Sequence, residues 1–201
     1  MLEKQDDLMS KVILNNTIIE ADKPYDLRDQ TVKDIPFKGA CNTMLYVGAR
    51  GIHGGSNLRF LTRHFNLKEV TLLEIWKPNI EVLHKHLPTH EIIEADFVEF
   101  VKTTEKKWDM VVWWHGPEHV ALQQCHDTLE NMKKLATKII ILGCPYGLSY
   151  PQGTIEGNVY EKHRSFPIPS VFHEHGYNTH SILLPGGKEG AGCHITAWLL
   201  K

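Results

Sequence analysis

Four glycines lie close together in the segment MLYVGARGIHGGSNL, between an apolar run and a segment of helical period. They are Gly48, Gly51, Gly54 and Gly55. Glycine suits such a turn because the missing Cβ permits positive φ and lets a ligand approach the backbone. The free N–H groups at the start of the following helix favour a carboxylate or a phosphate. The segment indicates an anion-binding turn, with a plain tight turn as the alternative.

Two acidic residues follow at the ends of the next two apolar runs. Glu74 ends the run VTLLE, 26 positions after Gly48, near the spacing at which an acidic side chain accepts hydrogen bonds from ribose hydroxyls. Asp96 follows the run EIIEA, where it could accept from the exocyclic amino group of adenine while Phe97 lies against the ring. The alternatives are that Glu74 caps a helix or pairs with a lysine, and that Asp96 is a helix N-cap.

A further polar group, HGPEH, follows the apolar run WDMVVWW. It offers His115, Glu118 and His119 where loops after parallel strands build sites in open α/β sheets. We expect His115 to act as a base or to orient an acceptor, because histidine titrates near neutrality. The alternative is a hydrogen-bonded histidine at a strand end. The two tryptophans before it should alternate faces, one in the core and one lining a pocket.

The elements that must position these residues are short apolar strands alternating with helices, the pattern of a parallel sheet covered on both faces. The periodicity predicts helices over 56–65, 78–87, 118–136 and 170–175. The strands are predicted at 43–47, 70–74, 91–94, 110–114 and 138–142, followed by a C-terminal hairpin at the sheet edge formed by 178–184, the turn PGGKEGAG, and 194–200.

A chain of 201 residues suits one compact domain. We assign residues 41–201 to that domain and residues 1–40 to an N-terminal helical cap. The Gly- and Pro-rich stretch at about 147–169 is expected to be a lid-like insertion, since long loops in compact domains are often functional. Its aromatic and charged residues suit closure over a small polar acceptor, or a homodimer contact: Tyr150, Glu156, Tyr160, His163 and Arg164.

Charge and composition limit the classes of binding partner that we expect. A net charge of -2 and a pI near 6.7 give no global positive field, so we do not expect nucleic acid to be bound. No apolar run reaches the ~20 residues needed to span a bilayer, and the acidic N-terminus does not resemble a signal peptide, so we expect a cytoplasmic protein. The four scattered cysteines and the histidine groups at 84–86 and 173–175 show no metal-ligand spacing, so no metal is expected.

The ordered series VGARGIHGG, LLEI, EADF, WDMVVWW and KIIILG resembles that of class I S-adenosylmethionine-dependent methyltransferases, over about residues 43–200. The resemblance implies a Rossmann-like α/β fold with a seven-stranded, mostly parallel sheet, an antiparallel C-terminal strand and helices on both faces. It implies that S-adenosylmethionine is the cofactor. In this family the glycine loop holds the methionine part, and the acids after the second and third strands hold ribose and face adenine.

By this resemblance the cofactor roles fall on Gly48, Gly51, Glu74 and Asp96. One departure is Tyr46, where the family commonly has an acid, so contact with the methionine amino group is expected to come from elsewhere. Arg50 and His53 are also unusual in such a loop, where they would bind the cofactor carboxylate or be solvated. With their neighbours, the predicted cofactor-binding residues are Gly48, Ala49, Gly51, Glu74, Ile75, Asp96, Phe97 and Trp114.

The acceptor is expected to be a small molecule, because no separate substrate domain is evident and the Asp-Pro-Pro-Tyr or Asn-Pro-Pro-Tyr series of base-directed amino methyltransferases is absent. A catalytic cysteine at Cys144, as in RNA cytosine-5 methyltransferases, is an alternative without the rest of that signature. The glycine spacing also resembles NAD(P)-binding short-chain dehydrogenases, but their Tyr-x-x-x-Lys pair is missing. A catalytically silent binding protein of the same fold, favoured by Tyr46, is the non-enzyme alternative.

Overall fold

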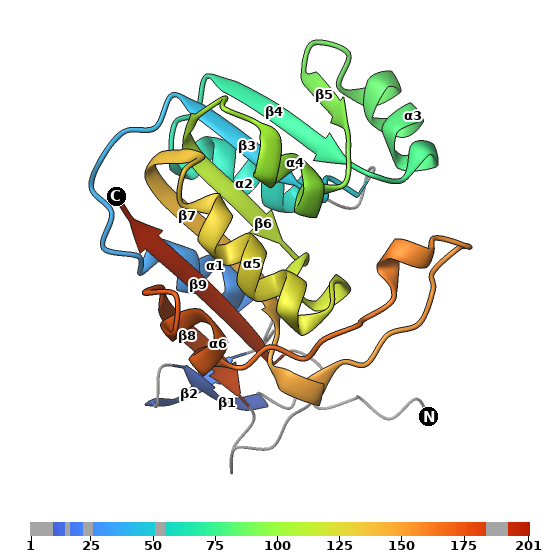
Figure 1. Ribbon diagram of the computed structural model, residues 1–201. Coiled ribbons are helices and arrows are strands. Elements are labelled where there is room, and N and C mark those ends of the chain that lie inside the picture. Colours follow the sequence, from blue (N-terminus) through green and yellow to red (C-terminus); the bar gives the residue numbers. More distant parts are fainter. Residues whose placement is uncertain (1–9, 15–16, 22–25, 51–54, 184–192) are drawn as a thin grey trace, which may run out of the picture.

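The computed structural model describes residues 10–14, 17–21, 26–50, 55–183 and 193–201, and it contains one mixed sheet with helices on both faces (Figure 1). The strand order is β2-β1-β8-β9-β7-β6-β3-β4-β5. The strands are β1 Ser10–Leu14, β2 Thr17–Ala21, β3 Thr43–Val47, β4 Glu69–Glu74, β5 Glu91–Glu94, β6 Trp108–Trp114, β7 Ala136–Pro145, β8 Asn178–Leu183 and β9 His194–Leu200.

The seven strands from β3 to β9 form the predicted sheet. β3, β4, β5, β6 and β7 pair in parallel, whereas β9 pairs antiparallel with both β7 and β8. The chain therefore runs from β3 to β4 and β5 on one side, and the crossover after β5 returns to β6 on the other side of β3. The predicted Rossmann-like fold, mostly parallel with an antiparallel C-terminal strand, is confirmed.

Six α-helices in the described ranges cover the sheet. α1, α2 and α3 contribute to the apolar core on one face, and α4, α5 and α6 to the core on the other, so the described chain has three layers (Figure 1). Their bounds are α1 Asp26–Lys33, α2 Gly55–His64, α3 Lys77–His86, α4 Phe97–Thr103, α5 Leu122–Met132 and α6 Pro169–His173.

Strand β3 shows why the predicted strands are continuous apolar runs. Met44 and Tyr46 pack in the core under α1 and α2, while Leu45 and Val47 pack in the core under α4 and α5. Successive side chains of a strand point to opposite faces, so a strand covered on both sides needs apolar residues at every position. None of the helices in the described ranges is long and apolar enough to cross a membrane.

The N-terminal helical cap is wrong for residues 10–14 and 17–21, which form an antiparallel pair of strands, and α1 is the helix within the described part of 1–40. Val12 pairs with Ile19 and Ile13 with Ile18, and β-branched residues favour strands over helices. β1 also pairs with β8, so the C-terminal hairpin does not form the sheet edge. The glycine-rich turn of that hairpin lies outside the described residues.

Two further differences concern helices. α4 was absent from the sequence prediction because its seven residues are too few to show a clear period. The helix predicted over 118–136 is shorter: Pro117–His119 forms a separate 3₁₀ turn, and β7 already begins at Ala136. Val120 and Ala121 have extended backbones between the turn and α5, which interrupts the helix.

Candidate active site

A cavity of about 580 Å³ lies at the carboxyl ends of β3, β4, β5 and β6. In open α/β sheets ligands bind outside the carboxyl ends of the strands, at the point where the strand order reverses. The insertion between β7 and α6 also contributes to its lining, and it extends past these strand ends (Figure 1, orange). Most of the predicted site residues line this cavity: Gly48, Glu74, Ile75, Asp96, Phe97, Trp114 and His115.

The start of the glycine turn is built for close approach of a ligand. Gly48 has φ +75°, and a Cβ added there would meet only one backbone oxygen, at 3.9 Å. Its N–H donates to the carbonyl of Leu73 at 2.9 Å, which ties the turn to β4. Ala49 is buried and is not among the lining residues, and Gly51 lies outside the described residues.

Tyr46 occupies the position where an acid was expected by resemblance. Its side chain is buried and lines the cavity, and burial raises the pKa of its hydroxyl, with a hydrogen bond to Asn57 acting in the opposite direction. The hydroxyl is therefore neutral and cannot supply the missing negative charge. Any cation bound near this end of the cavity must find another anionic partner.

Glu74 ends β4 with its carboxyl group directed into the turn that follows. Oε1 accepts from the backbone N–H of Ile75 at 3.0 Å and of Trp76 at 2.9 Å. Burial raises the pKa of Glu74, and these hydrogen bonds together with one to Asn79 oppose the increase. The alternative of a surface lysine pair does not apply, because Glu74 is only 5% exposed and its hydrogen bonds are local.

Asp96 acts as the helix N-cap that the sequence offered as an alternative, and it also lines the cavity. Its Oδ1 caps α4 by accepting from the N–H of Val98 at 2.8 Å, and the residue is also exposed to the cavity. Beside it, Phe97 is buried and its ring meets Trp113 edge-on, with centroids 5.3 Å apart. An acid and an aromatic residue thus line the cavity together at the end of β5.

His115 follows β6 in the left-handed backbone region, with φ 51°. Non-glycine residues adopt this region at a cost, and such strain is concentrated at functional sites. Its Nε2 lies 3.2 Å from Nη1 of Arg28 on α1, and its Nδ1 lies 3.1 Å from Oε1 of Glu118. Because a guanidinium only donates, Nε2 accepts and Nδ1 carries the proton that is donated to Glu118.

The predicted alternation of the two tryptophans is confirmed, with one correction. Trp113 packs in the core under α4 and α5, and Trp114 in the opposite core. Both line the cavity, whereas the sequence predicted only one at the pocket. The indole N–H of Trp114 is buried with no hydrogen-bond partner among the described residues, so a ligand atom could accept from it.

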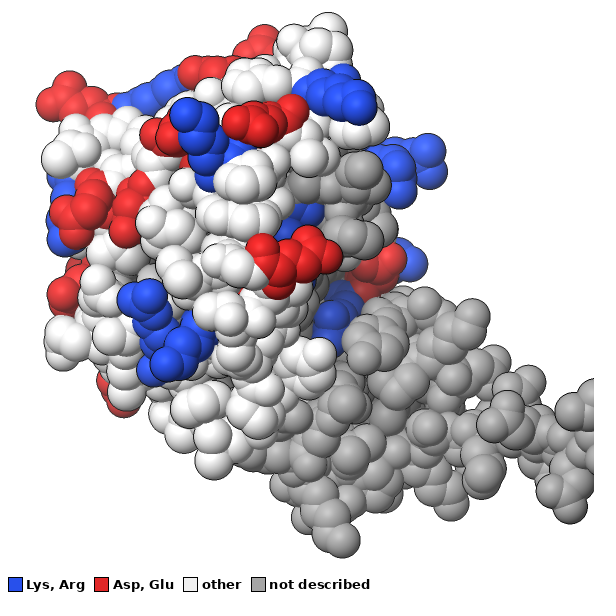
Figure 2. All heavy atoms as spheres, turned by 90° about the vertical axis from the view of Figure 1, so that its right-hand side faces the viewer, with Lys and Arg blue, Asp and Glu red and all other residues white. Residues whose placement is uncertain are grey.

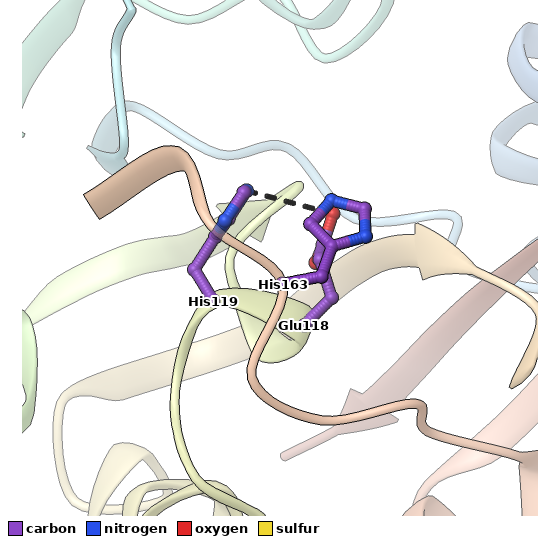
Figure 3. A group of neighbouring side chains, drawn as sticks. All are labelled: Glu118, His119 and His163. Atoms are coloured by element: carbon purple, nitrogen blue, oxygen red, sulfur yellow. Dashed lines mark ion pairs between the residues drawn. The ribbon is translucent and has the colours of Figure 1, made fainter. Parts of the chain in front are cut away.

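Glu118, His119 and His163 form a cluster of side chains that lines the cavity (Figure 3). The first two come from the 3₁₀ turn after β6, and His163 comes from the insertion. Burial alone would raise the pKa of Glu118, but hydrogen bonding from His115 and the nearby His115 and His119 side chains outweigh it, and the pKa is lowered. The sequence did not predict this cluster, because His163 lies in a segment without periodicity and no predicted element placed it beside Glu118 and His119.

The insertion is attached to the same 3₁₀ turn and to the glycine turn. The backbone N–H groups of Arg164 and Ser165 both donate to the carbonyl of Glu118, at 2.8 and 3.1 Å. Arg50 was expected to bind the cofactor carboxylate or to be solvated, and it instead forms an ion pair with Glu161 of the insertion at 2.9 Å. Of the insertion residues singled out from the sequence, the lining includes Tyr150, Tyr160, His163 and Arg164 but not Glu156.

Two further expectations can be compared with the structure. Cys144 is fully buried, and burial raises its pKa far above that of a free thiol, so it is no candidate nucleophile. On the face of the molecule drawn in Figure 2, basic and acidic side chains are interspersed. Among the described residues of that face, the Lys and Arg side chains do not gather into one broad patch.

No protein-family model matches the chain. Over 105 residues it is 26% identical to a polyamine aminopropyltransferase of Yersinia pestis (strain Pestoides F), a match that covers 47% of this chain and 32% of the relative. A polyamine aminopropyltransferase of Yersinia pseudotuberculosis serotype O:1b gives the same values. The chain thus spans about a third of the length of the curated relatives it matches.

Solved structures with the same fold are more extensive matches. The N-methyltransferase NodS from Bradyrhizobium japonicum WM9, in complex with S-adenosyl-L-homocysteine, aligns with a TM-score of 0.58 at 13% identity, over 89% of this chain and 85% of NodS. The plantazolicin methyltransferase BpumL, also in complex with that compound, gives 0.61 at 13% identity, over 89% and 84%. The chain therefore has the Rossmann-like fold of S-adenosylmethionine-dependent methyltransferases.

Proposed function

We propose that this protein binds S-adenosylmethionine in the cavity at the strand ends and transfers its methyl group to a small molecule. The observation that carries the proposal is the position of Glu74, a buried carboxyl group at the end of β4 that lines the same cavity as the open turn at Gly48. Burying a carboxylate costs free energy unless hydrogen bonds or a charged partner compensate for it. In Rossmann-like folds an acid at this position accepts hydrogen bonds from ribose hydroxyls.

The lining residues divide the cavity into regions with different chemistry. The backbone at Gly48 would face the methionine part, Glu74 the ribose, and Asp96 with Phe97 the adenine. When bound, the cofactor supplies an electrophilic methyl group on a sulfonium. The protein's task is then to align the acceptor and to remove a proton where the acceptor atom requires it.

His115 is proposed as the residue that orients the acceptor. It lines the cavity at the end of β6, and its ring is fixed on one side by Arg28 and on the other by Glu118. A small-molecule acceptor is supported because the insertion, which is attached to the carbonyl of Glu118 and, through Glu161, to Arg50, lines the cavity with polar side chains.

The strand order weighs against the dehydrogenase alternative. NAD-binding Rossmann sheets have six parallel strands, with nothing inserted between the fifth and the sixth. Here the antiparallel β9 lies between β7 and β8, the fifth and sixth parallel strands from β3 onward. The silent-fold alternative is supported only by Tyr46.

Titration calorimetry of purified protein with S-adenosylhomocysteine, NAD and NADP tests the proposal. We expect binding of S-adenosylhomocysteine alone, followed by production of that compound from S-adenosylmethionine in an acceptor screen. This product is specific to methyl transfer, because transfer of the propyl side chain from the sulfonium would release methylthioadenosine instead. Binding of only a nicotinamide nucleotide would overturn the proposal in favour of a dehydrogenase, and absence of any binding would favour the silent fold.

A further inference from the structure

The cluster of Glu118, His119 and His163 has the composition of a metal centre. It offers two imidazoles and one carboxylate, and the three candidate ligand atoms lie within 4.8 Å of one another. Glu118 is 1% exposed and His163 8% exposed, while His119 is only partly buried. Figure 3 shows the two rings and the carboxylate gathered in one place, although they come from two segments of the chain.

The hydrogen bonds of Glu118 leave one of its oxygens without a partner. Oε1 accepts from Nδ1 of His115 and lies 3.8 Å from Nε2 of His119. Oε2 is buried and has no hydrogen-bond partner among the described residues, and the same holds for Nδ1 of His119. A buried carboxylate oxygen left unsatisfied costs free energy, so this arrangement calls for a cation.

We propose that Glu118, His119 and His163 bind one divalent first-row transition-metal ion. Imidazole with a single carboxylate suits zinc, iron, cobalt or nickel, whereas magnesium and calcium prefer sites made of oxygen ligands. Ligand atoms at about 2.1 Å from a metal lie roughly 3.5 Å from one another, so closure from 4.8 Å requires movements of about 1 Å.

The surroundings supply the contacts that orient metal ligands. Metal-binding histidines and carboxylates are usually hydrogen-bonded to neighbouring groups that fix their direction. Here Glu118 receives the hydrogen bond of His115, and the ring of His163 hydrogen-bonds to the backbone of Tyr150. The backbone of Glu118 is itself fixed by the N–H groups of Arg164 and Ser165.

The three candidate ligands all line the cavity proposed for the cofactor and acceptor. Three protein ligands leave coordination positions open, as in catalytic rather than structural metal sites. An oxygen or nitrogen atom of the acceptor could occupy an open position. This last role rests on the proposed function, but metal binding itself does not.

The test is a titration of chelator-treated, dialysed full-length protein with Co²⁺, followed by visible absorption and by measurement of bound metal per chain. We expect one ion per chain with d–d bands, and at least tenfold weaker binding in both Glu118→Gln and His163→Gln. His163→Gln decides the matter if Glu118→Gln does not fold, which circular dichroism reports.

A second histidine pair provides the matched control. Nδ1 of His126 lies 2.9 Å from Nε2 of His175, beside α5 and α6. Substituting both histidines by glutamine should leave the cobalt spectrum unchanged. Loss of the bands in that control, or unchanged cobalt binding in His163→Gln, would overturn the proposal. A parallel titration of each sample with S-adenosylhomocysteine separates failure of the metal site from failure of the cofactor site.

Discussion

Substituting Glu74 by glutamine should weaken S-adenosylhomocysteine binding while preserving the fold. The amide keeps an oxygen that can accept from the N–H groups of Ile75 and Trp76. It removes the negative charge and exchanges one acceptor oxygen for a donor. The substitution should therefore weaken ligand binding without removing the hydrogen bonds that hold the turn, whereas alanine would remove those bonds as well.

The size of the effect follows from the number of acceptor positions. A carboxylate has about four lone-pair positions. Two backbone N–H groups and the side chain of Asn79 use three of them, leaving about one for a ribose hydroxyl. A hydrogen bond to a charged group contributes about 1.5–3 kcal/mol, so the dissociation constant should rise roughly 10- to 150-fold.

Isothermal titration calorimetry at pH 7.5 measures this change directly. Glu91→Gln is the matched control, since Glu91 begins the neighbouring strand β5 and bonds to Thr71 and Lys106 away from the cavity. The control should bind S-adenosylhomocysteine as the unmodified chain does. If folded Glu74→Gln also binds with unchanged affinity, the assignment of Glu74 to ribose is refuted.

Three further predictions concern Glu74, Asp96 and Arg50. Burial raises the folded-state pKa of Glu74, so its protonation adds stability that is lost as pH rises through that pKa. Ligand-free Glu74→Gln should therefore have a melting temperature at or above that of the wild type at pH 7 in differential scanning calorimetry. The difference in melting temperature should shrink toward pH 4. A variant that melts below the wild type by the same amount at every pH would contradict the reasoning. Asp96→Ala should cost about 1 kcal/mol in urea unfolding by removing the α4 cap, whereas Asp96→Ser should retain that stability, and both should weaken S-adenosylhomocysteine binding. Full affinity in Asp96→Ser would exclude an adenine contact. Arg50→Gln removes a partly exposed ion pair with Glu161 worth about 0.2–1 kcal/mol, so timed proteolysis should cut the insertion up to about fivefold faster, with a fall in melting temperature of at most about 4 °C. Equal cleavage rates would show that this pair does not hold the insertion.

The sheet and much of the cofactor side of the site could be predicted from the sequence because their signals are local. β5 and β9 have the predicted bounds, since each is an apolar run between clear turn residues. Gly48, Glu74 and Asp96 each follow or end such a run, and parallel strands bring their carboxyl ends to one edge. Knowing the strands was therefore enough to bring these residues together.

The contacts of His115 and the cluster of Glu118, His119 and His163 could not be predicted in this way. His163 lies in an irregular segment, and its position depends on the N–H groups of Arg164 and Ser165 bonding to the carbonyl of Glu118. Arg28 contacts His115 from a helix 87 residues earlier in the chain, with no motif to indicate the pair. The two N-terminal strands were missed for a related reason, because their pairing with β8 is a long-range contact.

The most direct test of the central claim is a crystal structure of the protein in complex with S-adenosylhomocysteine. We expect a ribose hydroxyl within hydrogen-bonding distance of Glu74 and the adenine between Asp96 and Phe97. We also expect the sulfur to be directed toward the region of His115. A ligand bound elsewhere, or an adenosine that makes no contact with Glu74, would contradict the proposed function.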